Sequence, residues 1–151
     1  MSWKTHVTAR PREGDQMGYS DTQHYNTELP EHHALVVTHL DYGLESGGSS
    51  PTHAVSIYHG TREGTGGPQN IRLHFPTMQH PDKAMIVHDP GARTTHSYVK
   101  APSPELRDLI EQHHRHANNT GAWAALLDKL AEEYPDMQPA VDAHVAARYS
   151  S

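Results

Sequence analysis

The chain contains no cysteine, and this absence removes several kinds of chemistry at once. Disulfide bonds, thiolate zinc sites and cysteine nucleophiles all require a thiol. The sequence also lacks the Gly-x-Ser-x-Gly motif that presents a nucleophilic serine in many hydrolases. Because no complete set of catalytic residues is recognisable, we expect a protein that is not an enzyme.

Long apolar runs and clusters of basic residues are lacking as well. No stretch of about 18 apolar residues is present, and the N-terminal residues 1–6 lack the apolar segment of a classical signal peptide. The formal charge is −6, and the 12 lysines and arginines never cluster, which disfavours binding to nucleic-acid phosphates. We therefore expect no nucleic-acid or membrane partner, and a location in the cytoplasm or in a virion without classical secretion.

Hydrophobic residues are few for a chain of this length. They make up 34% of the 151 residues, and there is a single phenylalanine. A chain of this size normally forms one domain with a real core, so this core is expected to be thin or to be completed by other subunits. The composition thus favours a homo-oligomer or a complex with other proteins. We expect one α+β domain over residues 31–151, preceded by a polar N-terminal arm over residues 1–30.

Histidine is the residue that the chain has in excess, with fifteen copies. Adding fifteen positive charges to −6 gives +9, so the net charge depends strongly on pH near the ordinary histidine pKa. Two segments of similar pattern, His33–His39 and His53–His59, carry a histidine at each end of an alternating apolar face. Read as β-strands, each places both of its histidines on the same side as its apolar residues.

Pairing of these two strands as a hairpin makes the pattern complementary. His39 then lies opposite His53, and His33 lies opposite His59. Imidazole is a common ligand of transition metals, so His33, His39, His53 and His59 are the candidate metal ligands, for an ion such as Zn²⁺. One cross-strand pair supplies only two ligands, and a third is expected from His74, His88 or His96. The alternative is that no cofactor binds and that the imidazoles cover the edge of the core.

Further strands are expected at 70–75, 84–88 and 96–99, separated by residues that favour turns. After Pro102 the apolar period changes from two to 3.6. Ser103, Thr120 and Asp136 are suitable N-caps for three successive helices. The expected fold is α+β, an antiparallel β-meander of about five strands followed by three C-terminal helices packed on one face of the sheet.

A second group of histidines lies in the first of these helices. His113 and His116 are i, i+3 neighbours, and Glu111 has the same spacing to His114, so either pair has the spacing to hold a metal ion. His113 also continues the apolar stripe of Leu106, Leu109 and Ile110. A solvated helix C-terminus, where a cationic imidazole is favoured by the helix dipole, is the simpler interpretation.

Two functional hypotheses follow from these patterns. The first is a non-catalytic structural, assembly or protein-binding subunit of a larger complex, such as a virion component, since the apolar content is low and no catalytic set is complete. The second is a histidine-rich metal-binding protein or a metal-dependent hydrolase that uses the strand histidines.

Overall fold

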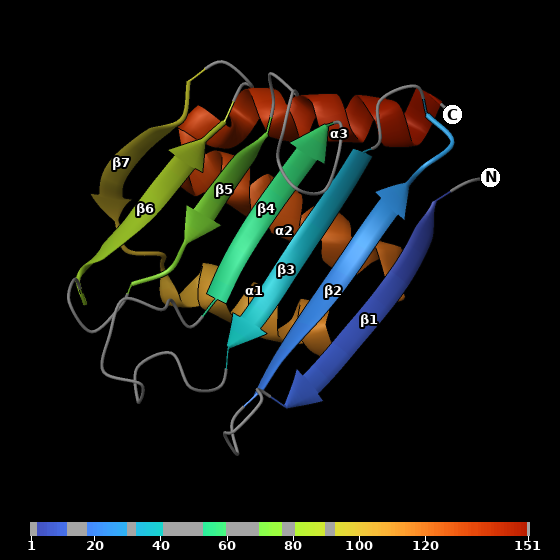
Figure 1. Ribbon diagram of the computed structural model, residues 1–151, viewed down its shortest axis with the longest axis horizontal. Coiled ribbons are helices and arrows are strands. Elements are labelled where there is room, and N and C mark those ends of the chain that lie inside the picture. Colours follow the sequence, from blue (N-terminus) through green and yellow to red (C-terminus); the bar gives the residue numbers. More distant parts are fainter. Residues whose placement is uncertain are drawn as a thin grey trace.

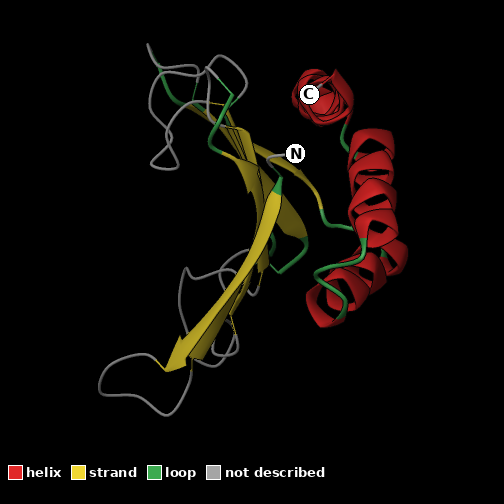
Figure 2. Cartoon of the chain, turned by 90° about the vertical axis from the view of Figure 1, so that its right-hand side faces the viewer, coloured by secondary structure: helices red, strands yellow, loops and turns green. Residues whose placement is uncertain are grey.

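The computed structural model describes residues 3–11, 18–29, 33–40, 53–59, 70–76, 81–89 and 93–150. One antiparallel sheet with its three helices packed on a single face forms two layers (Figures 1 and 2). The seven strands lie side by side in chain order, as β1 (Lys4–Pro11), β2 (Gly18–Asn26), β3 (His33–Leu40), β4 (His53–His59), β5 (Ile71–His74), β6 (Lys83–His88) and β7 (Thr95–Lys100). Within the described ranges, none of the helices is both long and apolar enough to cross a bilayer.

Strands β3 and β4 form the centre of the sheet because their alternating residues are apolar. Leu35 and Val37 of β3, and Val55 and Ile57 of β4, point toward the helices and are fully buried. The predicted register is confirmed, with His39 opposite His53 and His33 opposite His59. The strands expected at 70–75, 84–88 and 96–99 are present as β5, β6 and β7.

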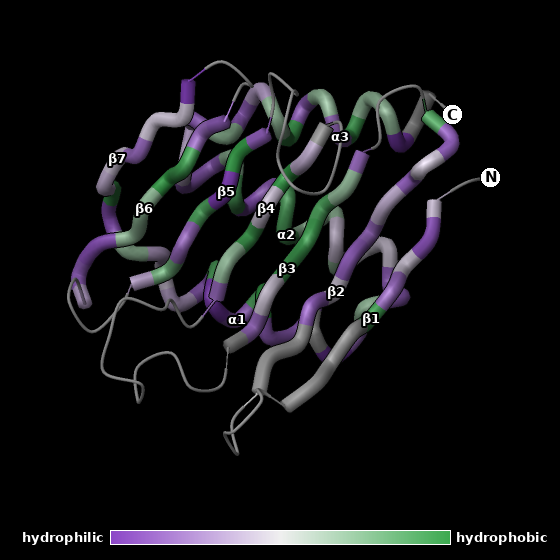
Figure 3. Tube along the Cα trace, viewed as in Figure 1, coloured by the Kyte–Doolittle hydropathy of each residue, from purple (hydrophilic) through white to green (hydrophobic). Residues whose placement is uncertain are grey.

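The sheet has seven strands where about five were expected, because residues 4–11 and 18–26 form β1 and β2. These strands were not predicted because their residues are mostly polar, whereas the centres of β3 and β4 are hydrophobic (green in Figure 3). Of the β2 side chains that the structure describes, Thr22, His24 and Asn26 are buried. The predicted boundary between an arm and a domain at residues 30 and 31 lies outside the described residues.

The three helices start near the predicted positions. They are α1 (Pro104–Arg115), α2 (Thr120–Glu133) and α3 (Gln138–Ser150), with a 3₁₀ turn, η1 (Pro135–Met137), before α3. Ser103 caps α1 as expected, since its hydroxyl accepts a hydrogen bond from the Leu106 amide. The cap of α2 is Asn119, not Thr120, because the Asn119 side chain accepts from the Gly121 amide. The predicted Asp136 cap is also wrong, because this residue lies within η1.

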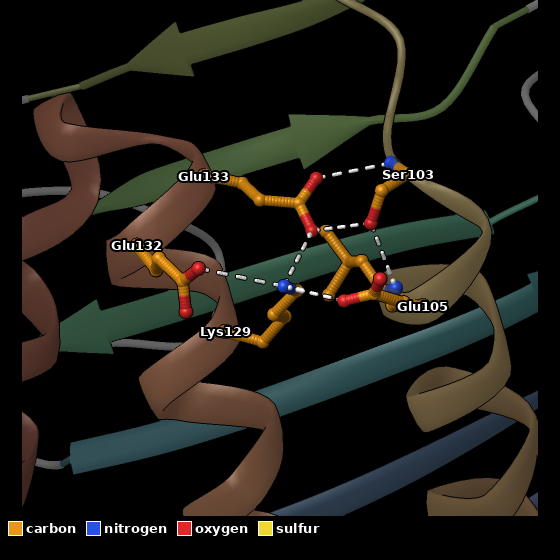
Figure 4. Close-up of polar contacts among 6 residues, drawn as sticks. Ser103, Glu105, Lys129, Glu132 and Glu133 are labelled. Carbon is orange, nitrogen blue, oxygen red and sulfur yellow. Dashed lines mark hydrogen bonds and ion pairs between the residues drawn. The ribbon is translucent and has the colours of Figure 1, made fainter.

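A polar network joins the N-terminus of α1 to α2 (Figure 4). The carboxylate of Glu133 accepts hydrogen bonds from the backbone amide and from the hydroxyl of Ser103. Lys129 of the same helix donates to Glu105 at 2.8 Å, and this bond lowers the pKa of Glu105 and raises the pKa of Lys129. The start of α1 is thereby held in a fixed position against α2.

Candidate metal centre

His39 and His53 meet at the end of the hairpin formed by β3 and β4. They are directly opposite each other in the register, on the side of the sheet that faces the helices. Nδ1 of His39 lies 2.7 Å from Nε2 of His53, and the ring centroids are 4.4 Å apart. The strand pairing therefore brings together two nitrogen atoms that are fourteen residues apart in the chain.

Glu111 of α1 completes a cluster of three potential ligands. Its Oε1 lies 3.2 Å from Nε2 of His53 and 3.6 Å from Nδ1 of His39. Figure 1 shows α1 behind the end of β3 and the start of β4, where the hairpin histidines lie. Among the described residues, these three are the one group of histidine and acidic side chains close enough to share a metal ion. We call them the metal-ligand cluster.

The spacing of the three ligand atoms can be compared with that of a tetrahedral zinc site. Bonds of about 2.0–2.1 Å to zinc place neighbouring ligand atoms about 3.3–3.4 Å apart. The observed separations of 2.7, 3.2 and 3.6 Å bracket this value. An ion would thus require the two imidazole nitrogens to separate by about 0.6–0.7 Å, together with a smaller shift of Glu111 toward His39.

The cluster lies at the border between the core and solvent. The side chains of His53, His39 and Glu111 are 12%, 24% and 39% exposed, so Glu111 is the most accessible of the three to solvent. Burial lowers the pKa of the His53 imidazole, and His39 and Arg107 lower it further, while the bond to Glu111 acts in the opposite sense. His53 is therefore biased toward the neutral form that binds metals.

The structure does not bring the histidines suggested as a third ligand, His74, His88 and His96, next to His39 and His53. His74 is paired with Ala54 and His96 with Val87, so both project from the face of the sheet that lacks helices. His88 pairs with Ile71 and Thr95, several residues along the sheet from His53. Glu111 was considered only as a partner of His114 within the helix, because its proximity to the hairpin depends on how α1 packs.

The second predicted histidine pair is only partly visible. His33 and His59 occupy opposite positions in the register as predicted. The His59 side chain lies outside the described residues, so a metal role for His33 and His59 stays a prediction. In the helical group, the interpretation as a solvated helix C-terminus is wrong for His113, which is fully buried, and fits His116, which is exposed beyond the end of α1.

A further group of histidines, which the sequence did not indicate, is packed among tryptophans between sheet and helices. His24 stacks on Trp3 with a centroid distance of 4.9 Å and contacts Trp123 at 4.8 Å. His144 of α3 meets Trp3 edge-on at 5.0 Å, and His113 meets Trp123 edge-on at 3.8 Å. We call these five residues the buried aromatic cluster. One available signal was the extension of the apolar stripe of α1 to His113.

Within the ranges that the structure describes, His24 has no carboxylate partner, in contrast to His53. Nδ1 of His24 lies 3.2 Å from the hydroxyl of Thr5, and the residue is only 4% exposed. Burial, with a smaller effect from Arg148, lowers the pKa of His24 to about 4. At neutral pH this imidazole is uncharged and packs as part of the core.

Comparisons with protein-family models, with curated proteins and with solved structures found no match to this chain.

Proposed function

We propose that this protein binds a divalent transition-metal ion through His39, His53 and Glu111. The observation that carries the proposal is the convergence of two imidazole nitrogens and one carboxylate oxygen, from two strands and a helix, within 4.8 Å of one another. Two imidazoles and a carboxylate form a common ligand set for Zn²⁺ with three protein ligands, and the same set suits Fe²⁺.

The protonation of the cluster favours a cation at its centre. Nε2 of His53 lies within hydrogen-bonding distance of both Nδ1 of His39 and Oε1 of Glu111. A single proton on Nε2 points best at one of these two acceptors. A metal ion interacts with all three lone pairs at once, and it offsets the cost of holding a carboxylate beside two half-buried rings.

The position of the cluster suits a specific site better than a surface contact. His39 and His53 are fixed by strand pairing, and α1, which carries Glu111, is held at its start by Ser103 and Glu133. Ligands on rigid elements lose little conformational freedom when an ion binds. Three protein ligands also leave a tetrahedral ion one further position.

The test is a Zn²⁺ titration of the untagged protein in competition with a chromophoric chelator. We expect one ion per chain, and we expect His53→Ala and Glu111→Gln each to weaken binding at least about 100-fold. Loss of residues that merely orient metal ligands costs about 10–100-fold, so the loss of a ligand should cost no less.

The matched control is His96→Ala, which removes an exposed imidazole on the other face of the sheet. This variant should bind Zn²⁺ as the unaltered protein does. Equal weakening by His96→Ala and His53→Ala would show that the ion is held by histidines in general and would overturn the proposal. Circular dichroism of each variant verifies that the fold is retained.

The hypothesis of an assembly subunit stays a prediction, and it is compatible with metal binding. Light scattering of the purified chain tests it. An assembly subunit should give a mass of at least two chains, whereas a monomer at high concentration that joins no larger particle would contradict the hypothesis.

A further inference from the structure

Arg107 places a positive charge beside the metal-ligand cluster. It precedes Glu111 by one helical turn, so both side chains lie on the same face of α1. The guanidinium carbon of Arg107 lies 5.2 Å from the centre of the Phe75 ring, and the same ring lies 5.3 Å from that of His53. Phe75 thus forms a shared apolar floor between the arginine and the cluster.

The guanidinium has no carboxylate partner within the part of the chain that the structure describes. The ion pairs there join His39 and His53 to Glu111, and Lys129 to three glutamates of α1 and α2. Arg107 is half-buried and stacks on the aromatic ring. Its hydrogen-bond donors are therefore available for an external acceptor.

The charges around the cluster select the kind of molecule that can occupy the remaining metal position. A divalent ion on two neutral imidazoles and one carboxylate keeps one positive charge, and Arg107 adds a second nearby. Arginine presents two parallel N–H donors that match the oxygens of a carboxylate or a phosphate. Water as the external ligand would leave the arginine without an anionic partner.

We propose that the metal centre of this protein binds an oxyanion, with one oxygen on the metal ion and another on the guanidinium of Arg107. This inference rests on the proposed metal-binding function. The shared chemistry of the ligand is a carboxylate or phosphate group, whether it belongs to a small molecule or to a side chain of another protein. Phe75 excludes water from one side of the anion and strengthens both contacts.

The experiment uses the full chain loaded with Co²⁺, whose visible absorption reports a change of ligand. Inorganic phosphate and acetate are titrated separately, and each should shift the spectrum in a saturable way. The tighter of the two identifies which oxyanion the site prefers. Arg107→Gln should raise the dissociation constant of the preferred anion about tenfold, which corresponds to about 1.4 kcal/mol, and should not weaken Co²⁺ binding, because it removes a positive charge from beside the ion.

The matched control is Arg115→Gln, which removes an exposed positive charge two turns further along α1. It should bind both anions as the unaltered protein does. Equal anion affinities of the Arg107→Gln and Arg115→Gln variants, or a Co²⁺ spectrum that neither anion changes, would overturn the oxyanion site while leaving metal binding in place. Failure of Co²⁺ to bind at all would overturn the metal-binding function as well.

Discussion

Histidine side chains have different roles in the metal-ligand cluster and in the buried aromatic cluster. In the first, His39 and His53 lie beside a carboxylate and are partly open to solvent. In the second, His24, His113 and His144 are almost completely buried among Trp3 and Trp123. The difference shows that the neighbours of an imidazole, not its abundance in the sequence, decide whether it is suited to bind a metal or to fill a core.

The α1 helix serves both clusters. Glu111 reaches the hairpin histidines, while His113 packs on Trp123. The two residues are only two positions apart, so they project in different directions from the helix. The same helix therefore connects the stability of the core to the geometry of the ligands.

The largest expected difference between the clusters concerns stability. Trp123→Ala removes a fully buried ring and a hydrogen bond to the Ala117 carbonyl, and should lower the free energy of unfolding by about 3–5 kcal/mol. His53→Ala, measured without metal, should cost about 1 kcal/mol. Urea unfolding measures both, and equal losses would mean that the metal-ligand cluster is simply another part of the core.

The response to acid should come from two buried histidines, His24 of the buried aromatic cluster and His74 on the face of the sheet that lacks helices, because burial lowers the pKa of each to about 4. The folded pKa of His24 is about 4 and its ordinary value is 6.5, so the unfolded chain takes up the proton first as the pH falls. The contribution of His24 to the free energy of unfolding is then fully present above pH 6.5. It decreases between pH 6.5 and about 4, by at most about 3 kcal/mol. The lowered pKa values of His53 and His74 act in the same direction.

Unfolding measured at intervals from pH 7.5 to 4 tests this expectation. His24→Gln should make the profile shallower without levelling it, because His74 still contributes, and the exposed His116→Gln should leave it unchanged. A profile of the unaltered protein that stays level to pH 4 would contradict the assignment of His24 to the core.

Stabilisation by Zn²⁺ should come only from the metal-ligand cluster. At a free Zn²⁺ concentration one hundred times the dissociation constant, the free energy of unfolding should rise by about 2.7 kcal/mol, because the ion binds the folded state. Thermal unfolding with and without Zn²⁺ measures this increase. It should fall to at most about 0.4 kcal/mol in His53→Ala and persist in His24→Gln. Loss of the increase in His24→Gln but not in His53→Ala would contradict the assignment of the metal site.

The smallest effect on stability is expected from a change at the N-terminus of α1, the helix that contributes a residue to each cluster. Ser103→Ala removes the N-cap of the helix and its contacts to Glu133, and should cost about 1 kcal/mol of stability. Because Glu111 is carried by the same helix, Zn²⁺ affinity should also decrease slightly. An unchanged unfolding midpoint in urea would show that the network in Figure 4 does not hold α1 in place.

The sequence was sufficient to predict the hairpin, because its register follows from local alternation. Leu35, Val37, Val55 and Ile57 mark one face of two strands, and the terminal histidines fix how the strands align. The three helices could be predicted equally well, since their apolar period and most of their boundaries are local features of the sequence. β1 and β2 were missed because their residues are largely polar, and the burial of Thr22, His24 and Asn26 on β2 depends on contacts with residues distant in the sequence.

The candidate site was predictable only in its strand component. Glu111 lies fifty-eight residues from His53, and its approach depends on the angle at which α1 crosses the sheet. No local sequence pattern specifies the angle between α1 and the sheet. The buried aromatic cluster could not be predicted from the sequence for the same reason. Its members come from separate elements or segments, as for Trp3, His24, Trp123 and His144.

The most direct test of the central claim is elemental analysis of the untagged protein after dialysis against Zn²⁺ and removal of the free ion. The account predicts about one equivalent of zinc per chain for the unaltered protein and for His24→Gln, and a strong loss of zinc in His53→Ala and Glu111→Gln. Less than about a tenth of an equivalent in the folded, unaltered protein would contradict it.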